Sequence, residues 1–522
     1  MPPLSNPRRG LILATVCLAA LAITLDTTIV NVALPDLSRQ LDASTRELQW
    51  IVDAYNLSFA ALVLTAGSLG DRFGRRPALL AGLAGFAVTS LIGGLADSAG
   101  ALVAIRFLMG ASAALIFPTT LSVIRNTFPD RRQRAKAVGL WGAVTGLGVA
   151  LGPVIGGTLL AHFSWPSVFF ALVPAAVVAL IAAWIFVPES SNPREARLDP
   201  PGLILSTAAV GILVYTIIEA PESGWTDPAR IAGFTAAAFL VLAFIAVERR
   251  RTTPMIDVSL FRNAAFSAAS GSITLAFFSL FGFIFLVTQY FQFIRGYGAL
   301  STGVRILPVA VSIAAGSLGG VAIAVRLGTR STVMAGLALL SVSFGWIAFS
   351  PTFMPYSTVV GQMILMGLGL GLTTAPATES ILSALPPAKA GIGSAVNDAT
   401  RETGGTLGVA VLGSVFTSLY AAHLPTTAFG MLPPRSVDAA QQSVAAALST
   451  ARDAPPVLQE RLIGAVQDSF MHGFHVACFA AACICLLGSF GASVLPGRPP
   501  STLDQMSETA RDTSPAADRL PG

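Results

Sequence analysis

The sequence predicts an all-α protein that crosses a membrane many times. Of its 522 residues, 53% are hydrophobic and only 11% are charged, whereas roughly a quarter of the residues of a soluble chain carry charge. The apolar residues form runs of about 20, the length of helix that crosses a bilayer. The basic residues behind the net charge of +5 lie mostly in the loops between these runs, so we expect membrane lipids and not nucleic acid as partners.

Fourteen apolar segments are long enough to cross the membrane, and an even number places both chain ends on one side. Basic residues lie mostly on the side of the N-terminus, so the positive-inside rule predicts that both termini are cytoplasmic. The first segment lacks a cleavage pattern of small residues and is expected to be retained. The predicted spans are 11–34, 47–69, 77–96, 100–124, 137–160, 166–187, 201–219, 230–248, 264–292, 302–325, 332–349, 356–382, 391–417 and 471–495.

A short internal repeat divides the chain into related halves. AGSLGDRFGRRPALLAGLA, from Ala66, aligns without a gap with GVAIAVRLGTRSTVMAGLA, from Gly320, each in a loop between two spans. Such repeats are typical of transporters built from two bundles. The predicted parts are a cytoplasmic N-terminus (1–10), an N-terminal six-helix bundle (11–188), a linker with two extra helices (189–250), five helices of the C-terminal bundle (251–417), an extracytoplasmic loop (418–469), the last span (470–496) and a disordered cytoplasmic tail (497–522).

The predicted extracytoplasmic loop contains an amphipathic stretch, from Ser436 to Gln467. Such a stretch can lie as a helix on the membrane surface, cap the outer mouth of the bundle, or serve only as a helical spacer. The sequence leaves these three alternatives open.

Several ionisable residues of the N-terminal half fall within predicted spans, where a charge is costly and marks a functional site. Asp26, in LDTTIVNVALP, either faces a cavity as a proton-coupling acid or anchors another helix, for example through Arg106. Arg106 either faces protein or a water-filled cavity, or reaches back to the outer interface. Asp53 is either a cavity acid or an interfacial one, and Asn31 is a further candidate cavity residue.

The thirteenth predicted span carries a second charged cluster. Asp398 and Glu402 are four residues apart, which places them on one helix face, and Arg401 is close enough to neutralise Asp398. The cluster is either a proton and substrate site or a self-neutralising contact between helices. On the ninth span, Gln289 and Gln292 are candidate cavity residues, and the many Phe side chains either line an apolar pocket or face lipid.

Two glycine-rich motifs complete the candidate machinery. In GSLGDRFGRRPALL, Gly70 and Gly74 permit a tight turn, and we predict a conformational latch formed by Gly67, Asp71, Arg72, Gly74, Arg75 and Arg76. The alternative is an ordinary basic loop. In the fifth span, small residues allow close helix packing and a proline bends the helix; they are Gly142, Gly146, Gly152, Pro153, Gly156 and Gly157.

These motifs together resemble a known family. GSLGDRFGRRPALL resembles the signature loop of the major facilitator superfamily. LDTTIVNVALP, RFLMGASAALIFP and GAVTGLGVALGPVIGG resemble the first-, fourth- and fifth-helix motifs of its fourteen-span drug:proton antiporter branch. The resemblance implies two six-helix bundles plus two extra helices. It implies proton coupling through Arg106 and cation recognition at Asp53, Asp398 and Glu402, although many relatives carry arginine at the position of Arg401.

No Walker-type nucleotide motif and no dinucleotide fingerprint occurs in the sequence, so we expect no cofactor, no enzymatic activity and a proton gradient as the driving force. Cys and His show no metal-ligand spacing, and no metal site is predicted. We therefore expect a monomeric antiporter of the multidrug efflux and antibiotic resistance type in a bacterial plasma membrane. It would export lipophilic drugs or related amphiphiles, whether cationic or not. The alternatives are an exporter or facilitator of a specific lipid or metabolite, and a receptor or scaffold without transport.

Overall fold

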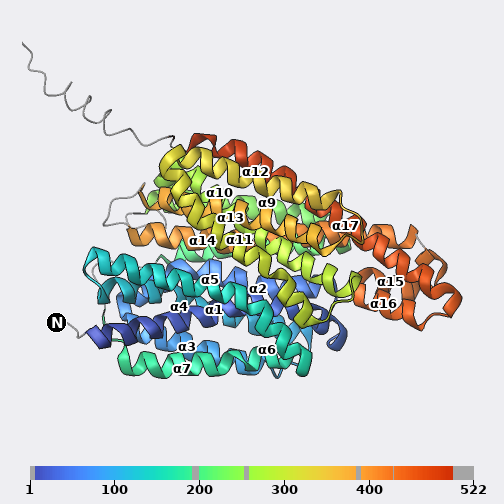
Figure 1. Ribbon diagram of the computed structural model, residues 1–522, viewed down its shortest axis with the longest axis horizontal. Coiled ribbons are helices and arrows are strands. Elements are labelled where there is room, and N and C mark those ends of the chain that lie inside the picture. Colours follow the sequence, from blue (N-terminus) through green and yellow to red (C-terminus); the bar gives the residue numbers. More distant parts are fainter. Residues whose placement is uncertain are drawn as a thin grey trace, which may run out of the picture.

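The computed structural model describes residues 6–190, 199–251, 258–383, 390–426, 428–495 and 497, which form helices and turns without a strand among them (Figure 1). The first helices are α1 (Asn6–Gln40), α2 (Thr45–Phe73), α3 (Arg75–Gly93), α4 (Ala99–Thr127), α5 (Arg131–His162), α6 (Pro166–Phe170), α7 (Leu172–Phe186), α8 (Pro200–Ser223) and α9 (Pro228–Arg250). They are followed by α10 (Ala264–Gln289), α11 (Ala299–Leu327), α12 (Thr329–Ala348), α13 (Tyr356–Ser383), α14 (Ala390–His423), α15 (Pro434–Gln442), α16 (Val444–Asp453) and α17 (Pro456–Gly491). A π-helical turn, η2 (Tyr290–Ile294), extends α10, and short 3-10 turns are η1 (Val258–Arg262), η4 (Leu424–Thr426), η5 (Ala428–Met431) and η6 (Ala492–Val494).

Polar capping residues begin many of the helices. At α2, the Ser44 side chain accepts from the Glu47 N–H while the Glu47 carboxylate accepts from the Ser44 N–H, a complete capping box. Side chains that accept from first-turn N–H groups also precede other helices, and they are Ser98, Asp130, Asp199, Asp227 and Asn263. Because the first backbone donors of a helix lack partners within it, these residues fix where the helices that they cap start.

Thirteen helical segments of the described chain are long and apolar enough to cross a membrane. The predicted span 47–69 is not among them, although it lies in α2, a helix of 29 residues. Several polar residues of α2 are buried, and they include Gln49, Asp53 and Asn56. Since α2 packs between α4 and α14 inside the bundle, the chain has the predicted all-α, fourteen-span architecture.

The two halves of the bundle meet along two seams. One half is α1–α7, and the other is α10–α14 with α17; α5 packs against α11 and α2 packs against α14 (Figure 1). The repeat is visible in the backbone, because Gly74 between α2 and α3 has φ +118° and Gly328 between α11 and α12 has φ +91°. Residues that carry a side chain rarely adopt such positive φ angles, so both copies of the turn require glycine.

The two extra helices lie beside one seam only. α8 packs against both α2 and α14, and its Glu219 and Glu222 pair with Arg46 at the start of α2. The Trp50 and Tyr215 rings of α2 and α8 lie 6.1 Å apart. α8 therefore covers the α2–α14 seam, while α9 packs mainly on α8.

Helical structure extends into the segment predicted as the extracytoplasmic loop. α14 continues to His423 and α17 begins at Pro456, and the short helices α15 and α16 between them lie at one end of the bundle (Figure 1). The hydroxyl of Ser443, which caps α16, lies 3.2 Å from that of Ser38 on α1, and α16 also packs on α17. This segment touches both halves at one end of the bundle, as the capping alternative predicts. The predicted tail, apart from Gly497, lies outside the described residues.

Candidate functional site

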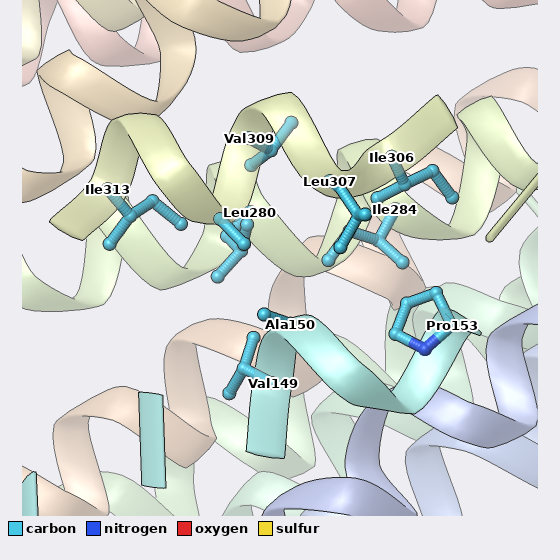
Figure 2. Close-up of a pocket in the computed structure, with 10 residues that line it drawn as sticks. Val149, Ala150, Pro153, Leu280, Ile284, Ile306, Leu307, Val309 and Ile313 are labelled. Atoms are coloured by element: carbon cyan, nitrogen blue, oxygen red, sulfur yellow. The ribbon is translucent and has the colours of Figure 1, made fainter. Parts of the chain in front are cut away.

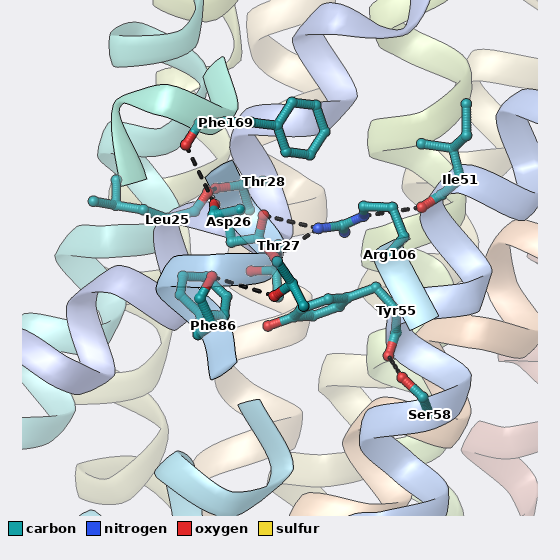
Figure 3. A network of polar contacts seen from close by, with 12 residues as sticks. Leu25, Asp26, Thr27, Thr28, Ile51, Tyr55, Ser58, Phe86, Arg106 and Phe169 are labelled. Atoms are coloured by element: carbon teal, nitrogen blue, oxygen red, sulfur yellow. Dashed lines mark hydrogen bonds and ion pairs between the residues drawn. The ribbon is translucent and has the colours of Figure 1, made fainter. Parts of the chain in front are cut away.

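A buried ion pair joins α1 to α4 (Figure 3). Nη1 of Arg106 donates to both carboxylate oxygens of Asp26, at 2.8 and 2.7 Å. Nε of Arg106 donates to the Ile51 carbonyl on α2 at 3.0 Å, and the guanidinium lies 4.3 Å from the centre of the Tyr55 ring. Asp26 and Arg106 are 0% and 1% exposed. The pair therefore holds three helices of one half together.

This geometry decides between the alternatives for both residues. The prediction that Arg106 reaches the outer interface is wrong, because its side chain ends on buried partners. Asp26 serves as the helix anchor in this conformation. Its neighbours Thr27 and Thr28 line a cavity between the two halves. Tyr55 was not among the predicted residues, because nothing in the sequence separates its ring from the other aromatic residues of apolar spans.

Asp53 lies at the seam between the halves. It is 0% exposed, and neither carboxylate oxygen has a hydrogen-bond partner in the described part of the chain. One helical turn earlier, Gln49 donates to the carbonyls of Val409 and Ala410 on α14, at 3.3 Å each. Helical periodicity places Asp53 on that same face. Asp53 is therefore an acid buried inside the protein, and an unpaired buried carboxylate is a candidate functional group.

A central cavity of about 460 Å³, its open mouth included, lies between the halves. Helices α1, α2, α4 and α5 form one wall, and α10 and α14 form the other. Most of the lining is apolar, and the aromatic residues in it are Phe59, Phe117, Phe277 and Phe281. The polar groups that converge there are threonine hydroxyls of α1 and the side chains of Arg401 and Glu402.

The charged cluster of α14 reaches this cavity. Arg401 lies with its guanidinium 4.6 Å from the centre of the Phe277 ring, and its Nη1 is 3.9 Å from Oδ1 of Asp398. Oε2 of Glu402 is buried without a hydrogen-bond partner in the described part of the chain. Arg401 thus interacts with Asp398, as the self-neutralising alternative requires, while Glu402 lines the cavity as an acid whose Oε2 has no partner.

Three other candidate cavity residues have partners elsewhere. Gln292 of η2 donates to the Val32 carbonyl of α1 at 2.9 Å, so it joins the two halves. Gln289 and Asn31 donate to carbonyls of their own helices. The alternative that the Phe residues of α10 mostly face lipid is wrong, since Phe278, Phe283 and Phe285 are buried and two others line the cavity; these two are Phe277 and Phe281.

The glycines of α5 divide into three groups. A Cβ added at Gly152 would overlap the Thr28 side chain, and one at Gly156 would lie 2.7 Å from Cγ1 of Ile29, so both positions pack against α1. Gly157 faces α11. Gly142 and Gly146 have open space within 4 Å. The prediction of close packing is confirmed for the first two groups and wrong for the third.

The predicted latch loop is bound within its own half. The turn consists of Gly74 alone, because Gly70 and Gly67 lie inside α2. The Arg75 N–H donates to the Ser190 carbonyl at 2.9 Å, and Nη2 of Arg76 donates to the Trp184 carbonyl at 2.5 Å. Arg72 is exposed, and the side chain of Asp71 lies outside the described part. The latch function stays a prediction.

Comparison with known proteins places the bundle in a family. Residues 16–409 match the Major Facilitator Superfamily. The chain belongs to this superfamily. It is 34% identical to the multidrug efflux pump LfrA of Mycolicibacterium smegmatis, over 92% of the chain and 94% of that protein. It is 34% identical to the tetracenomycin C resistance and export protein of Streptomyces glaucescens, over 91% and 90%.

A further relative and the solved structures agree with this assignment. The chain is 32% identical to the methyl viologen resistance protein SmvA of Salmonella typhimurium, over 93% of the chain and 97% of that protein. A bacterial homologue of the human lysosomal transporter Spinster, solved inward-facing and unoccupied, superposes with a TM-score of 0.63 at 17% identity, over 93% and 98%. This superfamily member therefore has a transporter fold and spans the membrane many times.

Proposed function

We propose that this protein exports lipophilic drugs and related amphiphiles across a bacterial plasma membrane in exchange for protons. The observation that carries the proposal is the cavity between the halves. Its lining is rich in Phe and includes Glu402, whose Oε2 has no hydrogen-bond partner in the part of the chain that the structure describes. The first-, fourth- and fifth-helix motifs support the same activity, as do the drug efflux and resistance functions of the relatives. We expect a monomer with both termini cytoplasmic.

The proposed cycle uses two kinds of acid. Glu402 can either hold a proton or pair as a carboxylate with a cationic group of the substrate. Because a protonated carboxyl has no charge for this pairing, binding of the substrate would release the proton. Asp53 lies at the α2–α14 seam, so its surroundings change when the halves rock. The Asp26–Arg106 pair keeps the N-terminal half rigid during this movement, since it connects three helices.

Proteoliposomes that contain a pH-sensitive dye test the proposal. Addition of a fluorescent lipophilic cation should release protons from the protein and drive dye-reported exchange, and an imposed proton gradient should accumulate the cation. Glu402→Gln should bind the cation without proton release. Substrate movement that is independent of the proton gradient would support the facilitator alternative, and no movement of any compound would support the receptor alternative.

A further inference from the structure

Two arginines of the C-terminal half lie together without a carboxylate. Arg295 follows η2, which contacts α16, and Arg305 lies in the second turn of α11. Both therefore lie at the end of the bundle that carries α15 and α16, which is the extracytoplasmic end in the proposed orientation. The sequence contains no Asp or Glu from residue 258 to residue 378. Within the described chain, no carboxylate lies within 4.0 Å of either guanidinium, so neither charge has a counter-ion there.

The two guanidiniums share one tyrosine ring. That of Arg305 lies 4.2 Å from the centre of the Tyr297 ring and 5.4 Å from the centre of the Tyr356 ring. Nη2 of Arg295 donates to the Tyr297 hydroxyl at 3.0 Å, while its Nη1 donates to the Met354 carbonyl at 2.7 Å. Because both side chains contact Tyr297, the two positive charges lie close together and are held in place.

Arg305 has donors that the described chain does not use. It donates hydrogen bonds there through Nη1 alone, to the carbonyl and the hydroxyl of Ser301, and its Nε is buried without a partner. A guanidinium carries five N–H donors in a planar fork that matches the oxygens of a phosphate group. An anionic phosphate ligand would therefore find free donors at Arg305 and would supply the missing negative charge.

One face of α11 continues from Arg305 as an exposed apolar stripe. Val304, Val311 and Leu318 recur at every seventh residue and are 46%, 69% and 79% exposed. Other side chains of α11 point inward, where they line a small apolar space with α5 and α10 (Figure 2). At 1.5 Å per residue, Leu318 lies about 20 Å along the helix from Arg305. This length covers one leaflet, which is half of the roughly 30 Å hydrocarbon core.

We propose that this surface binds an anionic phospholipid, with its phosphate on Arg305 and Arg295 and an acyl chain along Val304, Val311 and Leu318. The phosphate supplies the anionic oxygens that the described chain does not provide. The acyl chain covers the apolar stripe, which begins at the residue next to Arg305. A free phosphate ion would satisfy the same charges but would leave the stripe unused.

The proposed lipid site is separate from the export machinery. Neither arginine lines the central cavity, so the inference does not depend on the proposed export. The bound lipid would instead strengthen a junction between two loops. Arg295 contacts the α12–α13 loop through the Met354 carbonyl, and the Tyr356 hydroxyl of α13 donates to the Arg305 carbonyl at 3.1 Å. We therefore expect bound lipid to raise the Tm.

Lipid binding to the purified full-length protein in detergent tests the site. Native mass spectrometry measures how much phosphatidylglycerol is retained, and thermal unfolding measures the rise in Tm, each against phosphatidylcholine with the same acyl chains. We expect phosphatidylglycerol to bind more tightly. Arg305→Gln should lower its affinity by at least about tenfold, because hydrogen bonds to a charged group contribute this much or more. Arg305→Lys keeps the charge but not the fork, so its affinity should lie between the two.

Arg230→Gln is the matched control, since it removes the same charge from another half-buried arginine. Arg230 also lies over a tyrosine ring, 5.6 Å from the centre of Tyr215, but Asp227 is close to it in the chain. Its affinity for phosphatidylglycerol should stay near wild type. Equal losses in Arg230→Gln and Arg305→Gln, or equal binding of the two lipids by the wild type, overturn the site. If inorganic phosphate raises the Tm as much as phosphatidylglycerol does, the site binds a free anion and the lipid assignment is wrong.

Photolabelling of the wild-type protein decides the question even if the Arg305 variants fail to fold. The protein is placed in phosphatidylcholine liposomes that contain a trace of phosphatidylglycerol with a diazirine in its acyl chain. We expect the label on α11 between Val304 and Leu318, and we expect unlabelled phosphatidylglycerol to compete with it. Labelling spread evenly over the lipid-facing helices, or labelling that phosphatidylcholine removes equally well, overturns the proposal. Because both experiments measure binding and not transport, they stand whether or not export is confirmed.

Discussion

Removal of one partner from the Asp26–Arg106 pair should destabilise the protein strongly. Both groups are at most 1% exposed, and the guanidinium donates three hydrogen bonds, at 2.7 to 3.0 Å. In Arg106→Met the Asp26 carboxylate is left without its cationic partner. In Asp26→Leu the guanidinium keeps the Ile51 carbonyl and the Tyr55 ring but has no anionic partner. Breaking a buried pair in this way costs about 3–5 kcal/mol, whereas replacing both partners with apolar residues is often neutral.

The double variant Asp26→Leu/Arg106→Met separates the stability of the pair from its role in transport. Thermal unfolding of the purified protein in detergent should show a large loss of Tm in each single variant and recovery in the double variant. A coupling free energy of about 3 kcal/mol is the expected scale for such contacting residues. We also expect the double variant to lose proton-driven transport, because the family resemblance implies that proton movement is coupled through Arg106.

Two results would refute this reasoning. If the single variants unfold at the wild-type temperature, the pair does not hold α1, α2 and α4 together. If the double variant is as unstable as the sum of the two single variants, the carboxylate and guanidinium are stabilised by other partners. Transport by a stable double variant would leave the anchor in place and remove the pair from the coupling mechanism.

Three further predictions follow from single positions. Asp53→Asn should leave the Tm unchanged or raise it, since the carboxylate has no hydrogen-bond partner among the described residues to lose. The same variant should reduce substrate-induced proton release, and release at the wild-type level would show that Asp53 takes no part in the coupling. Gly152→Val should destabilise by about 1–3 kcal/mol through overlap with Thr28, while Gly142→Ala, in open space, should stay within about 0.5 kcal/mol; similar Tm losses in both would contradict the packing. Gly74→Ala should cost about 1–3 kcal/mol because of φ +118°, measured by thermal unfolding, and an unchanged Tm would show that the turn relaxes.

The local chemistry of the sequence was sufficient for the architecture. Runs of apolar residues locate nearly every span, because the bilayer admits only helices that satisfy their own backbone. Repeated glycines at the α2–α3 and α11–α12 turns reveal the two halves, since both turns need positive φ. The helical limits of 418–469 were not predictable in this way, because α14 and α17 continue beyond the apolar runs into polar sequence.

For the site, the sequence identified which residue types are costly in a membrane but not what they face. Asp26, Asp53 and Glu402 look alike as acids in apolar helices, and only helix packing distinguishes them. Asp26 meets Arg106, and Glu402 lines the cavity. Asp53 is buried at the seam without a hydrogen-bond partner among the described residues. Which side chain is paired depends on the rotation and contact of helices far apart in the chain, and that is a property of tertiary structure alone.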